Sequence, residues 1–170
     1  HGYACVRVDM RGNGDSNGIM EDEYTELELS DGLEVINWLA AQSWCDGKIG
    51  MMGISWGGFN SLQIAELAPE PLKAIITLCS TVDRYADDIH YKGGCLLNEN
   101  LGWGSTMWSY SSRPPDPLLV GDAWVNMWTK RFGQVPGSLI LITVTMAFST
   151  PLFRIAVTLS LKPTDRVVLA

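Results

Sequence analysis

The sequence predicts an α/β fold in which a parallel sheet is flanked by helices. Short apolar runs alternate with segments of helical periodicity, in the order strand, helix, strand, helix, strand, between residues 3 and 79. The connections between these segments are short, which favours parallel strands joined by right-handed crossovers. Of the 170 residues, 46% are hydrophobic and 18% are charged, so the chain has enough apolar side chains for a sizeable core.

The first strand and the first helix are predicted within the first 42 residues. Residues 3–9 (Y-A-C-V-R-V-D) form a short β-branched-rich run, and a glycine-rich turn follows at 11–18. A helix is expected over about residues 22–42, with acidic residues at its amino end that suit the helix dipole. Apolar residues recur in it at helical spacing: Leu29, Leu33, Ile36 and Ala40.

Two further strands and a second helix complete the alternating pattern. Residues 48–53 form an apolar strand, and a helix is expected from residue 57 to about 67, where Pro69 and Pro71 prevent its continuation. Residues 72–79 (L-K-A-I-I-T-L-C) predict a third buried strand. These elements indicate the core of an open α/β sheet.

The second half of the chain has a different texture. Residues 80–132 are punctuated by glycine and proline, with helical periodicity near 116–132, and we expect a helical excursion lying over the sheet. This segment holds four tryptophans: Trp103, Trp108, Trp124 and Trp128. Residues 138–161 are apolar, but a membrane span needs ~20 uninterrupted apolar residues, and here Pro151, Arg154 and several threonines intervene. The sequence therefore favours a buried segment, or one without a proper fold, over a membrane helix.

The run 53–58 (G-I-S-W-G-G) carries the strongest chemical signal. Ser55 lies at the apex of a predicted strand-to-helix turn so tight that side chains at the flanking positions would collide, which explains the glycines on both sides. Such a turn exposes the serine hydroxyl over the end of the sheet and places the backbone N–H of Trp56 beside it as an oxyanion donor. The pattern favours Ser55 as a nucleophile over a serine that merely fits a tight turn.

A serine nucleophile needs a base, and the chain has two histidines, His1 and His90. With Ser55 and Asp87, His90 reproduces the order serine, acid, histidine. The three residues from Asp87 to His90 are too few to supply two separate strand-end loops. We therefore favour a structural or substrate-proximal role for His90, with the role of catalytic base as the alternative.

Several other functions are disfavoured by composition and pattern. The glycines of residues 12–18 imitate a dinucleotide fingerprint, but they do not open a helix, and the next helix begins with carboxylates that would repel a pyrophosphate. We expect a turn beside the active site instead, stabilised by Asp9, Arg11 and Ser16. The net charge of −7 argues against a nucleic-acid partner. No membrane association is expected.

The cysteines and histidines indicate neither a cofactor nor a metal. The four cysteines are far apart with no C-x-x-C pair, and two histidines leave little for a zinc site. Cys5 and Cys79 are expected to be small buried hydrophobes in a reducing compartment, which favours a cytoplasmic protein. The chain begins at His1 and enters a strand almost at once, as though cut from a longer protein.

Three long motifs resemble the cocaine-esterase / X-prolyl dipeptidyl-peptidase-type (CocE/NonD) family of α/β-hydrolases. They are V-R-V-D-M-R-G-N-G-D-S-N-G at 6–18, W-C-D-G-K-I-G-M-M-G-I-S-W-G-G at 44–58 and L-K-A-I-I-T-L-C-S-T-V-D-R-Y-A-D-D-I-H-Y-K-G-G at 72–94. The resemblance implies an incomplete α/β-hydrolase core at 1–82, the start of a helical cap at 83–132, and an atypical tail at 133–170.

The same resemblance implies a serine hydrolase of small-molecule esters, amides or peptides, of esterase or dipeptidyl-peptidase type. Ser55 would be the nucleophile and the Trp56 N–H one oxyanion donor. In the family, the second donor is a tyrosine from an upstream loop, and the acid and histidine come from strands after the cap; neither these nor the usual jelly-roll domain has a counterpart here. The chain is therefore expected to be a fragment lacking the triad acid and histidine, or else an inactive remnant.

Overall fold

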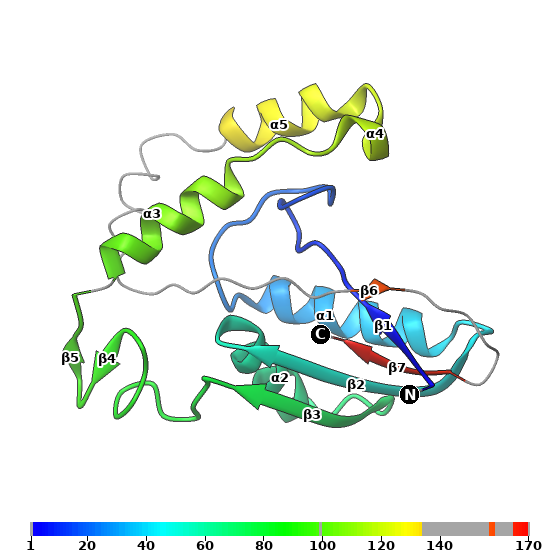
Figure 1. The fold of residues 1–170 in the computed structure, drawn as a ribbon, viewed down its shortest axis with the longest axis horizontal. Helices are drawn as coiled ribbons and strands as arrows, with labels where there is room; N and C mark the ends of the chain where they lie inside the picture. The colour runs from blue at the N-terminus through cyan, green and yellow to red at the C-terminus, as the bar shows by residue number, and fades with distance from the viewer. Residues whose placement is uncertain (1, 99, 134–156, 159–164, 170) are drawn as a thin grey trace. The chain divides into compact units, whose positions relative to one another are not determined.

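The computed structural model describes residues 2–98, 100–133, 157–158 and 165–169 (Figure 1). The chain divides into two compact units, and each is considered by itself. The first unit comprises His1–Val8, Tyr24–Val82 and Leu152–Ala170, and the second comprises Asp9–Glu23 and Asp83–Pro151.

The first unit is built on a five-stranded sheet with the order β3-β2-β7-β1-β6. Its strands are β1 (Tyr3–Val6), β2 (Cys45–Ile54), β3 (Leu72–Leu78), β6 (Val157–Thr158) and β7 (Asp165–Leu169). The pairs β3·β2, β2·β7 and β7·β1 are parallel, and β6 runs antiparallel to β1 at the edge. The predicted α/β class with a parallel sheet is confirmed, with strand bounds that differ by up to three residues at an end.

The place of β7 is the feature of this sheet that local patterns did not predict. Although β1 and β2 are joined by a helix, they are not hydrogen-bonded neighbours, because β7 lies between them and pairs with both. Val167 is the register partner of Ala4 on β1 and of Ile49 on β2. The last strand in the sequence thus connects the two halves of the sheet.

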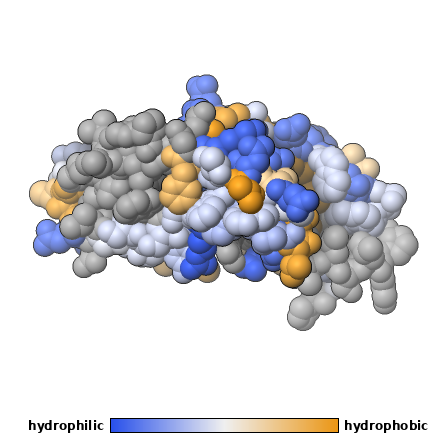
Figure 2. Space-filling view, turned by 90° about the horizontal axis from the view of Figure 1, so that it is seen from above, coloured by the Kyte–Doolittle hydropathy of each residue, from blue (hydrophilic) through white to orange (hydrophobic). Residues whose placement is uncertain are grey.

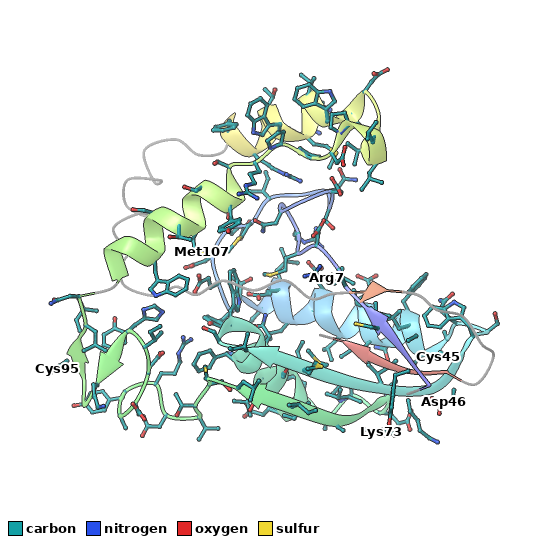
Figure 3. The ribbon with its side chains drawn as sticks, viewed as in Figure 1. Arg7, Cys45, Asp46, Lys73, Cys95 and Met107 are labelled. Carbon is teal, nitrogen blue, oxygen red and sulfur yellow. The ribbon has the colours of Figure 1, made fainter. Side chains whose placement is uncertain are left out.

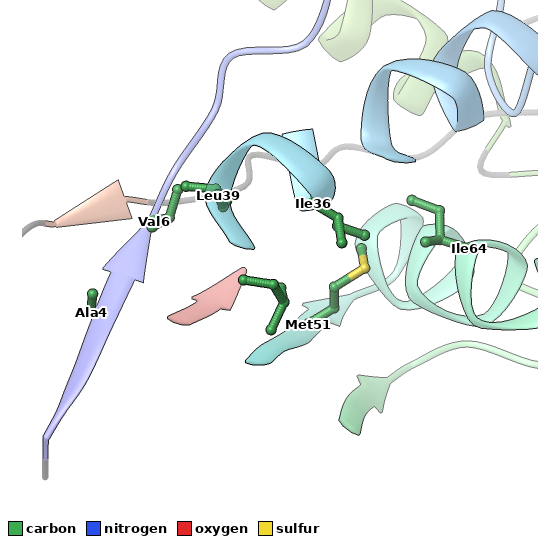
Figure 4. Packing of buried hydrophobic residues seen from close by; sticks show 7 residues of the cluster. Ala4, Val6, Ile36, Leu39, Met51 and Ile64 are labelled. Carbon is green, nitrogen blue, oxygen red and sulfur yellow. The ribbon is translucent and has the colours of Figure 1, made fainter. Parts of the chain in front are cut away.

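Two helices pack on one face of this sheet. Helix α1 (Glu26–Ala40) connects β1 to β2, and α2 (Trp56–Glu66) connects β2 to β3. Their buried side chains meet those of the strands in one cluster (Figure 4): Ala4, Val6, Ile36, Leu39, Ile49, Met51 and Ile64. Burying each large aliphatic side chain of this kind contributes about 1.5–3 kcal/mol.

The opposite face of the same strands keeps large apolar side chains exposed. Successive strand residues point to opposite faces, so the neighbours of buried Ile49 and Met51 point away from α1 and α2. Met52 and Ile54 of β2 are 39% and 52% exposed. Ile76 and Leu78 of β3 are 56% and 53% exposed.

The described residues of the second unit form a short hairpin and three helices. Its elements are β4 (Tyr91–Lys92), β5 (Cys95–Leu96), α3 (Asn100–Ser111), α4 (Pro117–Val120) and α5 (Ala123–Gly133). The helical periodicity predicted near 116–132 corresponds to α4 and α5. Asp116 caps α4, since its side chain accepts from the N–H of Leu118 at 2.8 Å.

On the face drawn in Figure 2, hydrophobic residues lie in small groups between hydrophilic ones.

Within this unit, Arg131 of α5 holds the glycine-rich turn that follows β1. Its guanidinium donates to the carbonyls of Gly14 at 3.0 Å and Ser16 at 2.7 Å, and the residue is 7% exposed. Burial lowers the pKa of Arg131, while the nearby carboxylates of Asp15 and Asp9 oppose that shift.

The turn is also stabilised from within, as expected for Asp9 and Ser16. Asp9 Oδ2 accepts from the N–H of Asp15 at 3.0 Å, and the Ser16 hydroxyl donates to the Asp9 carbonyl at 2.6 Å. These bonds use the turn's polar groups for its own structure. They support the interpretation of a structural turn rather than a phosphate cradle.

The cysteines differ from the expectation that Cys5 and Cys79 are buried. Cys5 is half-buried and Cys79 is exposed. Cys79 lies one residue beyond the end of β3, where the chain turns with a φ of 51°, so it has left the packed part of the strand. None of the helices in the described part of the chain is long and apolar enough to cross a membrane.

A proline at position 167 tests the place of β7. Val167→Pro removes an N–H from a strand paired on both sides, and the unpaired partner is expected to cost about 1–3 kcal/mol more than Val167→Ala, which keeps that N–H. Urea denaturation of the two variants measures the difference. Equal stabilities would contradict the central position of β7.

Candidate active site

The candidate site lies at the carboxyl end of β2, where the strand passes directly into α2. Ile54 is the last residue of β2, Trp56 is the first of α2, and Ser55 alone makes the turn with φ 57° and ψ −121°. A positive φ is costly for a residue with a Cβ and persists where the surroundings enforce it. The tight strand-to-helix turn expected from the sequence is present.

Glycine is required on both sides of Ser55 because α2 begins close to the end of β2 and close to the end of β3. A Cβ added to Gly53 would lie 2.6 Å from the carbonyl oxygen of Gly57. A Cβ added to Gly58 would lie 2.7 Å from Ser80 Oγ and 2.9 Å from the carbonyl oxygen of Leu78. Neither separation is one that a real Cβ tolerates, so the glycines are needed for the close approach itself.

The backbone of Ser55 is held on both sides. Its N–H donates to the carbonyl of Leu78 on β3 at 2.8 Å, and its carbonyl accepts from the N–H of Phe59 at 2.9 Å, which closes the first turn of α2. The Ser55 side chain makes no capping hydrogen bond to the helix. The hydroxyl is therefore not used for helix capping, the usual role of a serine in this position.

The amino end of α2 supplies electrostatic stabilisation next to this hydroxyl. The first N–H groups of a helix have no intrahelical acceptor, and the helix dipole places partial positive charge there. The N–H of Trp56 follows Ser55 directly in the chain, so an oxygen developing negative charge near Ser55 has a donor at hand. Its role as an oxyanion donor stays a prediction.

The Trp56 side chain is hydrogen-bonded to Glu28, a residue that the sequence motifs did not indicate. The Trp56 indole, 1% exposed, donates to Glu28 Oε1 at 2.8 Å, and Asn60 Nδ2 donates to the same oxygen at 2.7 Å. The local signal was Thr25-x-x-Glu28, a capping-box pattern at the start of α1. That pattern predicts a helix start and does not indicate a contact with α2.

His90 belongs to the second unit, whereas Ser55 belongs to the first, and the pairing of the two remains a prediction. His90 is 1% exposed, and its carbonyl accepts from the N–H of Leu97 at 2.9 Å, beside the β4–β5 hairpin. Asp88 accepts from Arg84 Nε at 2.8 Å. The groups around His90 thus take part in local turns, which fits the structural role favoured for it.

At the amino ends of β2 and β3, charged side chains interact with residues two or three positions away in the sequence. Asp46 and Lys73 lie near the amino ends of β2 and β3 (Figure 3). Asp46 Oδ1 accepts from the N–H of Lys48 at 3.0 Å, and Lys73 pairs with Glu70 at 2.8 Å. In the described part of the chain, no group of three or more His, Cys, Asp or Glu side chains is placed to hold a metal ion.

Comparison with known proteins identifies the family. The family model described as X-Pro dipeptidyl-peptidase (S15 family) matches residues 1–138. The chain belongs to this family. The matched region includes the turn around Ser55, and the resemblance inferred from the three sequence motifs is confirmed.

Relatives of this S15 chain include esterases and a solved hydrolase. A putative serine esterase of Mycobacterium tuberculosis is 30% identical over 129 residues, which cover 76% of the chain and 20% of the relative. Cocaine esterase of Rhodococcus sp. is 35% identical over 105 residues, 61% of the chain and 18% of the relative. A crystal structure of a CocE/NonD family hydrolase from Staphylococcus aureus matches with a TM-score of 0.50 and 28% identity, covering 76% of the chain and 24% of that structure. The S15 chain thus spans about a fifth of the length of these curated relatives.

A methyl group at Gly53 tests the close approach at the turn. Gly53→Ala places a Cβ against the backbone of Gly57, and we expect a loss of about 1–3 kcal/mol or more in the free energy of unfolding. Gly102→Ala is the matched control, because no atom lies within 4 Å of its added Cβ in α3. The control is expected to gain about 0.5–1 kcal/mol from helix propensity. A Gly53→Ala variant as stable as the control would contradict the described turn.

Proposed function

We propose that this chain carries the nucleophile of a serine hydrolase that cleaves esters or amides through an acyl-enzyme. The observation that carries the proposal is the strained backbone of Ser55, enforced by glycines on both sides at the amino end of a helix. Strain of this kind concentrates at functional sites. Membership of the S15 family and similarity to serine esterases support the same reaction class.

The proposed reaction has two acyl-transfer steps. Ser55 Oγ attacks the substrate carbonyl carbon while a base removes the hydroxyl proton, and the carbonyl oxygen becomes an oxyanion facing the N–H of Trp56. The bond to the leaving alcohol or amine then breaks, and the proton from the base passes to that leaving group. Water attacks the resulting Ser55 ester, which releases the carboxylic acid and restores the hydroxyl.

The substrate class is inferred from the relatives. The family description names an X-Pro dipeptidyl-peptidase, and the relatives include a cocaine esterase and a putative serine esterase. A small ester, amide or peptide is therefore the proposed substrate. The four tryptophans between residues 103 and 128 favour an apolar or aromatic acyl group.

A second candidate function is a chain with no activity of its own. The observation in its favour is that no histidine follows His90 in the sequence. His90 itself is buried in surroundings that fit a structural role, so the chain offers no clear catalytic base. Loss of the histidine from a serine triad lowers turnover by ~10⁶. We therefore propose a nucleophile and one oxyanion donor without the triad acid and histidine.

Labelling with a fluorophosphonate separates the two candidates. The 170-residue chain is expected to label slowly at Ser55, and added imidazole is expected to accelerate labelling because it supplies the base. Mass spectrometry of the peptide that contains Ser55 measures the adduct. Ser55→Ala should show no adduct with or without imidazole.

Two outcomes of the fluorophosphonate experiment would contradict the proposal. If the wild-type chain forms no Ser55 adduct even in imidazole, while a known serine esterase labels under the same conditions, the chain has no competent nucleophile. An adduct of equal size in Ser55→Ala would place the reactive group elsewhere.

The role of His90 is tested by truncation of its side chain. His90→Ala is expected to lower the melting temperature, because the residue is 1% exposed, and to leave the labelling rate in imidazole unchanged. Labelling kinetics below the melting transition and circular dichroism provide the two measurements. Loss of imidazole-independent labelling in a folded His90→Ala variant would instead assign the base to His90.

A further inference from the structure

Glu28 occupies a helix-capping position but bonds differently from a capping residue. Thr25 is the N-cap of α1, and its hydroxyl accepts from the N–H of Glu28 at 3.2 Å. In a capping box, the glutamate would in return accept from the N–H of the N-cap residue. Here Glu28 Oε2 accepts from the N–H of Tyr24, one residue earlier, at 2.5 Å.

The other carboxylate oxygen of Glu28 reaches the first turns of α2. Oε1 accepts from the Trp56 indole at 2.8 Å and from Asn60 Nδ2 at 2.7 Å. Trp56 and Asn60 are four residues apart, so they lie on one face of α2, and they are 1% and 4% exposed. Hydrogen bonds to an ionised carboxylate are shorter and stronger than neutral ones. One carboxylate thus accepts three donors from two segments of the first unit.

These bonds join Tyr24, whose backbone has a positive φ, to Trp56, the residue that directly follows the positive-φ Ser55. Tyr24 and Ser55 both have a φ of 57°. The Tyr24 ring also packs 5.9 Å from the Trp56 ring and 5.9 Å, edge-on, from the Phe59 ring. Tyr24, Glu28 and the first turn of α2 therefore form one connected cluster next to Ser55.

We propose that Glu28 is a positioning residue for the Ser55 nucleophile, an inference that rests on the proposed function. Its carboxylate fixes the Trp56 side chain, and the Trp56 main chain provides both the peptide bond after Ser55 and the proposed oxyanion N–H. A strained φ persists only where its surroundings over-determine it. The Glu28 bonds restrain the first residues of α2, which follow Ser55. The bond from the Ser55 N–H to the Leu78 carbonyl restrains Ser55 from β3.

The carboxylate is the group that this cluster requires. Tyr24, Trp56 and Asn60 each donate to this carboxylate, so both oxygens of Glu28 act as acceptors. A glutamine would present its NH₂ either to the Tyr24 N–H or to the pair formed by Trp56 and Asn60, and a donor would then face a donor. Glu28→Gln therefore disrupts the cluster with almost no change in size.

The test compares Glu28→Gln with Glu26→Gln in the 170-residue chain. Both changes remove one charge from the first turn of α1, but the Glu26 side chain is exposed, whereas Glu28 bonds to α2. Fluorophosphonate labelling in imidazole is measured over a range of probe concentrations, at a temperature where each variant is folded. We expect the maximal labelling rate of Glu28→Gln to fall by about 10-fold to 100-fold, because small displacements of a reacting group cost that much. The probe concentration at half-maximal rate should stay unchanged, and Glu26→Gln should label like the wild type.

A second measurement is independent of reactivity. The ¹H–¹⁵N resonances of the Ser55 and Trp56 amides are expected to shift in Glu28→Gln and to stay in place in Glu26→Gln. If the wild type does not label but these resonances shift, the proposed function fails, while the structural part of the inference, that Glu28 positions the turn at Ser55 and Trp56, is supported. A Glu28→Gln variant that labels at the wild-type rate with unshifted Ser55 and Trp56 amides would overturn the positioning role, even if its melting temperature is lower.

Discussion

The structure of the first unit depends on how closely two backbone segments approach at the end of β2. The backbone of Gly57 lies so near Gly53 that a Cβ added to Gly53 would collide with it. This approach lets the chain reverse from strand to helix within one residue, so Ser55 takes a backbone angle that serine ordinarily avoids. It also sets where α2 starts and therefore which of its residues face α1 and the sheet.

Residues of α1 and α2 support this turn from the helix side. Ile36 and Ile64 join Met51 in the apolar core, while Glu28 joins Trp56 and Asn60 through hydrogen bonds. The apolar contacts have little directional preference, whereas the carboxylate bonds fix the orientation of a particular side chain. The apolar contacts and the carboxylate hydrogen bonds thus contribute differently to the structure. One holds the helices on the sheet, and the other determines how the first turn of α2 is oriented beside Ser55.

The sheet itself shows where local patterns stop being informative. Each predicted strand and helix of the first 82 residues is present, because apolar periodicity and turn residues act within a few positions of the chain. The pairing of β7 with β1 and β2 joins residues more than a hundred positions apart. No local signal at residues 165–169 specifies that position, since pairing depends on the hydrogen-bonding edges left open by the other strands.

The sequence by itself determined the α/β class, the S15-type motifs and the turn that presents Ser55, since glycine spacing and a buried strand directly express the steric demands of that turn. Tertiary structure alone decided that β7 separates β1 from β2, that Cys79 is exposed, and that Glu28 bonds to Trp56. The physical reason is the same in each case. A short motif records the conformation of its own backbone, whereas the partner of a strand edge or a carboxylate is chosen by the packing of distant segments.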